Sequence, residues 1–147
     1  MGAHPDDIVD GEIFAIEVIF PFVQVDQACE AGFIQAEEVE EAAILAATSE
    51  LLQALLRANP AMQVEDVASA WFTATDDLRA AFPARAAREL GWTETALMCA
   101  QEMRVRGGLE RCIRVLLHWN TDLGQGEVKH VYLREARSLR PDLEKDK

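Results

Sequence analysis

Residues 99–122 hold the side chains best suited to chemistry, because an arginine stands inside an apolar segment there. Arg114 follows Cys112 and Ile113 and precedes three more apolar residues. A buried guanidinium is strongly destabilising unless an anion meets it, so Arg114 needs a partner. Glu102, which precedes it on the other side of a Gly-Gly turn, is one candidate. A bound anionic ligand is the other, and the residues alone leave both alternatives open.

Further arginines and one tyrosine lie beside apolar residues in the second half of the chain. Arg85 and Arg88 are three residues apart, Arg140 precedes a proline, and Tyr132 is the single tyrosine. Arginines that converge on one cleft would suit a small dicarboxylate, because a guanidinium binds a carboxylate in two-point fashion. Each also has a simpler interpretation, as a solvated helix face (Arg85, Arg88), a local salt bridge (Arg140) or a core or edge position (Tyr132).

The cysteines and histidines do not form a metal-binding or disulfide pattern. Cys29, Cys99 and Cys112 contain no C-x-x-C pair and leave an odd count. This argues against a disulfide framework or a cysteine zinc site and favours a reduced, cytoplasmic setting. By default Cys99 and Cys112 are small buried hydrophobic residues. The three histidines also lack metal-ligand spacing; they are His4, His118 and His130.

Length and charge favour one acidic globular domain. The chain has 147 residues and a net charge of −12, and residues 1–56 contain no lysine or arginine. This charge argues against nucleic acid and against anionic membrane surfaces as partners. The apolar run 13–25 is short and is interrupted by Glu17 and Pro21, so it is neither a spanning helix nor a standard signal peptide. It reads as a strand-like segment or as an exposed apolar extension.

The spacing of apolar residues predicts helices mixed with strands. Residues 37–59 show three- and four-residue spacing, which indicates an amphipathic helix that ends at Asn59-Pro60. Pro83 predicts the start of a short helix over 83–90, and Gly91 its end. The predicted strands are 67–75, which carries no charge and reads as buried, 95–99, 111–119 and 130–133. The fold class expected is mixed α/β (α+β): a single small domain, with a mixed sheet and packed helices.

Six segments in a fixed order resemble the small monofunctional chorismate mutases of the trimeric pseudo-α/β-barrel class. These segments are 72–78, 81–88, 99–103, 107–115, 130–133 and 139–143. The resemblance implies a chorismate-mutase-like domain over 31–143, preceded by an atypical extension over 1–30 and followed by a charged tail over 144–147. It also implies an isomerase that rearranges chorismate to prephenate for phenylalanine and tyrosine biosynthesis. The step is pericyclic and uses no cofactor and no metal.

The resemblance further assigns roles within one subunit. Arg114 would face the ether oxygen of chorismate, where negative charge develops as the C–O bond breaks. Glu102 and the region of Cys99 would hold the ring hydroxyl. Tyr132 would bind a carboxylate, and Arg140 would help to cover the substrate.

The resemblance also implies a homotrimer with its sites between subunits. The neighbouring subunit would then contribute Phe82 and Arg88 to each site, with Arg85 at the rim. These three residues fall in one of the matching segments, which runs from Ala81 to Arg88.

The sequence departs from the family pattern at one position. Ala31 stands where the family has an arginine that contacts the substrate, immediately before the matching Gly32, and the first arginine in the chain is Arg57. One interpretation is divergence, giving a catalytically impaired homologue that binds an anionic metabolite. Another is a change of reading frame in the gene, because codons for residues 28–31 can read Val-Arg-Gly in a second frame.

Overall fold

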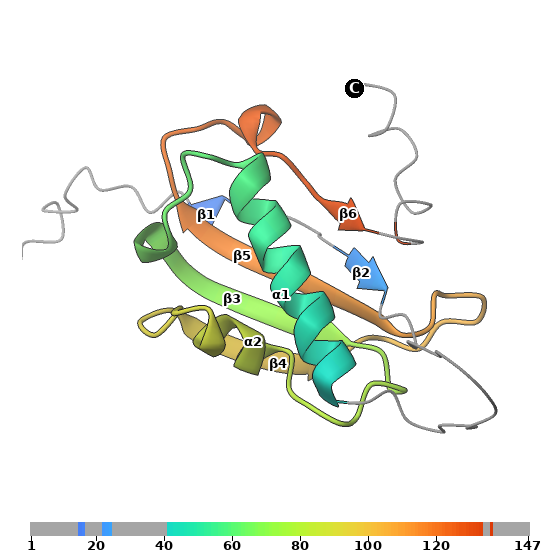
Figure 1. The fold of residues 1–147 in the computed structure, drawn as a ribbon. Coiled ribbons are helices and arrows are strands. Elements are labelled where there is room, and N and C mark those ends of the chain that lie inside the picture. Colours follow the sequence, from blue (N-terminus) through green and yellow to red (C-terminus); the bar gives the residue numbers. More distant parts are fainter. Residues whose placement is uncertain (1–14, 17–21, 25–40, 134–135, 137–147) are drawn as a thin grey trace, which may run out of the picture.

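A mixed six-stranded sheet organises the chain (Figure 1). The computed structural model describes residues 15–16, 22–24, 41–133 and 136. The strands are β1 (Ala15–Ile16), β2 (Phe22–Gln24), β3 (Val67–Ala74), β4 (Ala96–Gln101), β5 (Cys112–Asn120) and β6 (Tyr132–Leu133). The helices are α1 (Glu41–Ala58) and α2 (Ala84–Glu89), with 3₁₀ turns at Val64–Asp66 and Gln125–Glu127. The expected mixed α+β domain with packed helices is confirmed.

The order of the strands places β3 between β4 and β5. The sheet runs β4-β3-β5-β2-β6, and β1 also pairs with β5. β3 is antiparallel to β5 and parallel to β4. Parallel neighbours need a crossover connection, and here α2 lies within it. β4 and β5 therefore do not form a hairpin around Gly107 and Gly108, although the sequence suggests a direct crossing there.

Both helices pack on one face of the sheet, and within the described residues no helix covers the other face, called the open side below (Figure 1). On β3 the covered side carries Ala70 and Phe72, which are fully buried, whereas Trp71 between them is 42% exposed. Met98 on β4 is likewise 45% exposed. The prediction of a buried strand at 67–75 is therefore right for one face only. The strand lacks charge on both faces, but the described part of the chain covers only one of them.

The core lies between this covered face and α1. The predicted helix 37–59 is observed from Glu41 to Ala58, and residues 37–40 lie outside the described part. Its spacing at three and four residues puts one apolar stripe against the sheet. Among the fully buried side chains of the core are Ile44, Leu51, Leu52 and Leu55 from α1, Phe72 from β3, and Ile113, Val115 and Leu117 from β5.

Two short strands come from the acidic N-terminal segment. β1 and β2 are antiparallel to β5, and β2 is also parallel to β6. β2 thus fills the position between β5 and β6, so the strand-like interpretation of the apolar run 13–25 holds for these residues. The division of the chain at residue 30 stays a prediction.

The end of α1 is tied to the segment that leads into β6. Asn59 follows the last helical residue and is only 4% exposed. Its Nδ2 donates to the Leu55 and Lys129 carbonyls at 3.0 Å, and its Oδ1 accepts from the Lys129 amide at 2.8 Å. One buried amide thereby satisfies the helix end and fixes the approach to Tyr132.

Replacing Asn59 by alanine should destabilise the fold. The change removes these side-chain hydrogen bonds and leaves the amide and carbonyl of Lys129 without their part-buried partner, which costs about 1–3 kcal/mol. Chemical denaturation measures the free energy of unfolding. The matched control is Gln53→Ala, because the Gln53 amide bonds only Ser49 on the exposed side of α1. Equal losses in the two variants would contradict the role given to Asn59.

Candidate active site

An ion pair between Arg114 and Glu102 lies on the open side of the sheet. Arg114 Nη2 is 2.9 Å from Glu102 Oε1, and their side chains are 31% and 20% exposed. Of the two candidate partners, Glu102 is therefore the one that Arg114 meets within the chain, although neither side chain is completely buried. Thr73 donates its hydroxyl to Glu102 Oε2 at 2.5 Å. A cation, an anion and a hydroxyl thus meet at one point.

Three adjacent strands bring these groups together. Arg114 on β5 is the register partner of Thr73 on β3. Glu102 follows β4, and its amide donates to the Ala74 carbonyl at 2.8 Å, which extends the β3–β4 pairing by one residue. β3 therefore holds Glu102 on one side and Arg114 on the other. Because these backbone contacts fix the pair, its orientation does not rest on the two side chains alone.

A cavity of about 670 Å³ opens beside the ion pair. Its walls come from the turn after β3, the loop between β4 and β5, and the start of β5. Among the lining residues are Thr75, Asp77, Glu102, Arg104, Leu109, Cys112 and Arg114. The cavity joins charged groups of both signs to apolar surface, which is the composition expected of a site for a small polar ligand.

Tyr132 lies in the same row of the sheet as Arg114. The row runs through β2, where Phe22 is the register partner of Arg114 on one side and of Tyr132 on the other. Two strand spacings separate Tyr132 from Arg114, roughly 10 Å. Tyr132 is half-buried and packs with Cys112 and Leu109. The fold therefore places Tyr132, which is predicted to bind a substrate carboxylate, in the row of the sheet that carries the Arg114 guanidinium.

Cys99 lines a second cavity, of about 700 Å³, together with Phe82. Cys99 is the β4 partner of Phe72 and packs against the core. Burial raises the pKa of the Cys99 thiol, and a backbone hydrogen bond at Ala84 only partly opposes this. The thiol is therefore neutral near pH 7. Within one chain Cys99 and Glu102 face different cavities, so their shared role at a hydroxyl stays a prediction.

Arg85 and Arg88 have local partners rather than the ion pair within one chain. Arg85 pairs with Glu41 and Glu89, and its pKa is raised chiefly by the hydrogen bond to Glu41. Arg88 donates to the carbonyls that follow α2, including that of Thr93 at 2.9 Å. These local partners match the simpler interpretation of a solvated helix face.

Phe82 and Arg140 complete the set of predicted residues. Phe82 is 75% exposed, so it is available to another molecule. Arg140 lies outside the described residues, as does Ala31.

Thr73 is the residue of this site that the sequence reasoning missed. It sits in the uncharged run 67–75, which reads as uniformly buried. The signal was its alternation with Phe72: successive strand residues face opposite sides, and Thr73 shares the side of Trp71. When a neighbouring strand carries an arginine on that side, a polar strand residue there is a candidate hydrogen-bond donor to the anion that pairs with the arginine.

Comparison with known proteins identifies the family. The family model for chorismate mutase type I matches residues 31–143. The chain belongs to this family. It is 52% identical to chorismate mutase AroH of Thermus thermophilus over 113 residues, covering 77% of this chain and 93% of that protein. It is 44% identical to chorismate mutase AroH of Bacillus subtilis (strain 168), again over 113 residues, covering 76% and 88%.

A solved structure agrees with this assignment to the chorismate mutases. The fold matches the chorismate mutase from Clostridium thermocellum with a TM-score of 0.71 and 42% sequence identity. The match covers 82% of this chain and 96% of the other. In the described part of the chain, no group of His, Cys, Asp and Glu is arranged to hold a metal ion. None of the described helices is long and apolar enough to span a membrane.

The register of β2 allows a test of which N-terminal position belongs beside Arg114. The resemblance to the chorismate mutases puts Ala31 at the position of the family arginine, whereas the sheet puts Phe22 next to Arg114 and Tyr132 in strand register. We expect Phe22→Arg to lower KM for a dianionic substrate by about tenfold, the effect of one added charged hydrogen bond. Ala31→Arg, measured in the same assay, should have the smaller effect. The reverse ranking would contradict the register.

Proposed function

We propose that the chain rearranges chorismate to prephenate, the isomerase step that leads toward phenylalanine and tyrosine. The observation that carries the proposal is the Arg114–Glu102 pair at the cavity wall of a chain that belongs to the chorismate mutase type I family. The relatives at 44–52% identity carry the same activity in their names. A catalytically impaired homologue, the alternative raised by Ala31, finds no support in these comparisons.

The chemistry asks for positioning and charge stabilisation. In one pericyclic step the ether C–O bond breaks and a C–C bond forms, with no proton transfer and no covalent intermediate. Negative charge grows on the ether oxygen as the bond lengthens. A cation already oriented in a partly dry site stabilises that charge more than it stabilises the ground state. Arg114 is the group we assign to this role.

Glu102 has two roles in this proposal. It orients the Arg114 guanidinium through the 2.9 Å contact, and Thr73 in turn holds the carboxylate through its other oxygen. The carboxylate also offers an acceptor to the ring hydroxyl of the substrate. Two carboxylates of the substrate need donors too, and Tyr132 in the Arg114 row and the C-terminal Arg140 are assigned to them.

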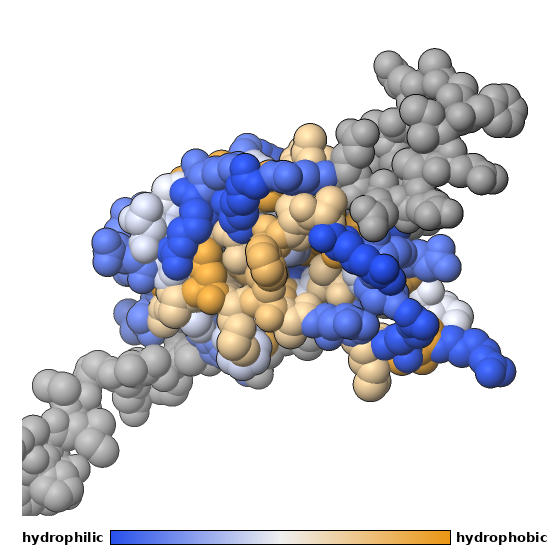
Figure 2. Space-filling model, turned by 90° about the horizontal axis from the view of Figure 1, so that it is seen from below, coloured by the Kyte–Doolittle hydropathy of each residue, from blue (hydrophilic) through white to orange (hydrophobic). Residues whose placement is uncertain are grey.

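We propose further that the protein is a homotrimer with sites between subunits. Two features of the chain support this: Phe82 projects 75% exposed, and Trp71 and Met98 leave apolar surface on the open side of the sheet. Figure 2 shows apolar residues gathered between hydrophilic ones on the side where β4 and α2 lie. Apolar surface of this kind marks a contact with another protein.

A neighbouring subunit would then supply the groups that one chain lacks at its ion pair. We assign Phe82 and Arg88 of the neighbour to the wall of the cavity, and Arg85 to its rim. The same proposal places the enzyme in the cytoplasm, since its cysteines show no disulfide pattern.

Replacing Arg114 by glutamine should reduce kcat by about a hundred- to a thousand-fold, as the loss of one preorganised donor typically does. The decrease of chorismate absorbance with purified protein measures the rate. Arg57→Gln is the matched control, because Arg57 is an exposed residue in the last turn of α1. No turnover above background by the unmodified protein at millimolar chorismate would refute the proposed function.

Trp71→Asp should convert the trimer into monomers, because it buries a charge in the proposed contact. Sedimentation should give about three times 16.3 kDa for the unmodified protein and about that single mass for the variant. Activity should fall with the mass. Gln53→Asp adds the same charge to the exposed side of α1 and should change neither quantity. A monomeric, fully active unmodified protein would exclude the trimer.

A further inference from the structure

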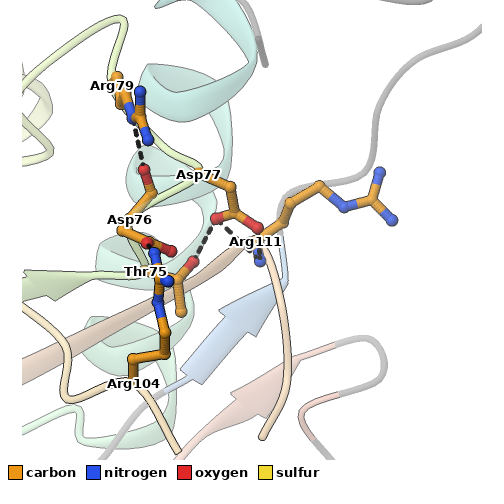
Figure 3. Close-up of polar contacts among 6 residues, drawn as sticks. All are labelled: Thr75, Asp76, Asp77, Arg79, Arg104 and Arg111. Carbon is orange, nitrogen blue, oxygen red and sulfur yellow. Dashed lines mark hydrogen bonds and ion pairs between the residues drawn. The ribbon is translucent and has the colours of Figure 1, made fainter. Parts of the chain in front are cut away.

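A polar cluster outside the ion pair joins the end of β3 to the start of β5 (Figure 3). The Asp77 carboxylate accepts the Thr75 hydroxyl at 2.6 Å and the Arg111 amide at 3.0 and 3.2 Å. The Thr75 hydroxyl in turn accepts the Cys112 amide at 2.9 Å. The Thr75 amide donates to the Cys112 carbonyl at 3.0 Å, which continues the β3–β5 pairing.

The cluster holds Arg111 in an unfavourable backbone conformation. Arg111 has φ +51° and is the one non-glycine residue with positive φ in the described ranges. A residue with a side chain adopts left-handed backbone only at an energetic cost, so the surroundings must enforce it. The two contacts from the Arg111 amide to Asp77 do so. Figure 3 shows the Arg111 side chain extending away from the turn, so the contact is made by the backbone.

The conformation of Arg111 sets the start of β5 and thereby the position of the Arg114 backbone. β5 starts at Cys112, immediately after the left-handed residue, and Arg114 is two positions further on the same side of the strand. On the other side of the turn, Arg104, which follows Glu102 by two residues, pairs with Asp76. The turn after β3 therefore anchors both ends of the loop that separates Glu102 from Arg114.

We propose that Asp77 is a positioning residue for the Arg114–Glu102 pair, acting through the left-handed Arg111. It touches no reacting atom in this proposal. Its carboxylate sets the backbone from which the Arg114 side chain departs, and a displacement of about 1 Å at such a group can cost on the order of a hundred-fold in rate. The inference rests on the proposed function for its kinetic readout.

The kinetic test is a double-mutant cycle with Arg114. Asp77→Ala should lower kcat for chorismate roughly tenfold or more, with KM changed less than threefold. In an Arg114→Gln background the same change should have almost no further effect on kcat, because it acts through Arg114. A loss of stability alone would lower the rate equally in both backgrounds. Additive losses would therefore overturn the proposal.

Three variants define the route. Asp77→Asn keeps an oxygen acceptor for the Arg111 amide and should retain most of kcat; it also serves if the alanine variant fails to fold. Arg111→Gly in the Asp77→Ala background should recover part of kcat, since glycine adopts positive φ without a Cβ penalty. Asp122→Ala, beyond the opposite end of β5, is the matched control and should be neutral. No recovery with glycine would exclude the route through Arg111.

A second readout separates this proposal from the proposed function. The ¹H–¹⁵Nε resonance of Arg114 in the full chain reports its setting without any substrate. It should shift or broaden in Asp77→Ala and stay unchanged in Asp122→Ala. An unmodified protein without chorismate turnover would refute the function, whereas an unchanged Arg114 resonance in Asp77→Ala would refute the positioning role.

Discussion

The physical constraint behind this structure is that a guanidinium in a half-buried strand requires an anion. Arg114 satisfies it with Glu102 at 2.9 Å, and Thr73 fixes the second carboxylate oxygen. A pair of this kind gains little in net stability, since desolvation opposes the attraction. What the arrangement provides is a cation held in a defined orientation at the wall of a cavity. Electrostatic stabilisation of a developing negative charge depends on that orientation being set before the reaction.

Most of the local structure follows from the sequence. The three- and four-residue spacing predicts α1, and Pro83 and Gly91 bracket α2 within one residue at each end. The need of Arg114 for an anion leaves Glu102 and a bound anionic ligand as candidates, and only the structure shows the pair with Glu102. The order of the strands does not follow, because β3 enters between β4 and β5 from far away in the sequence. Thr73 and Asp77 become part of the site only through that long-range pairing: strand alternation can place Thr73 on the side of Trp71, but it cannot place Thr73 beside Arg114.

The N-terminal segment illustrates a different limit. Its acidity and its lack of arginine set it apart from the rest of the chain, yet β1 and β2 join the sheet beside β5. Pairing between strands depends on backbone hydrogen bonds and on the open position between β5 and β6, not on charge. The family resemblance suggests Ala31 as the position of the family arginine, whereas strand register makes Phe22 the neighbour of Arg114. The two criteria differ because the first compares positions along the sequence, whereas the second compares residues that are neighbours across paired strands.

The half-covered sheet gives a reason for assembly that is independent of any resemblance. α1 and α2 bury one side of β3 and β5, while Trp71 and Met98 on the other side remain close to half exposed. The same open side carries Arg114, Thr73 and Glu102, so whatever covers the apolar surface also bounds the ion pair. Excluding water there strengthens the field of the guanidinium, because charges interact more strongly at low dielectric. A second copy on this surface, as proposed above, would therefore complete the site chemically as well as sterically, and the exposed Phe82 is available for such a contact.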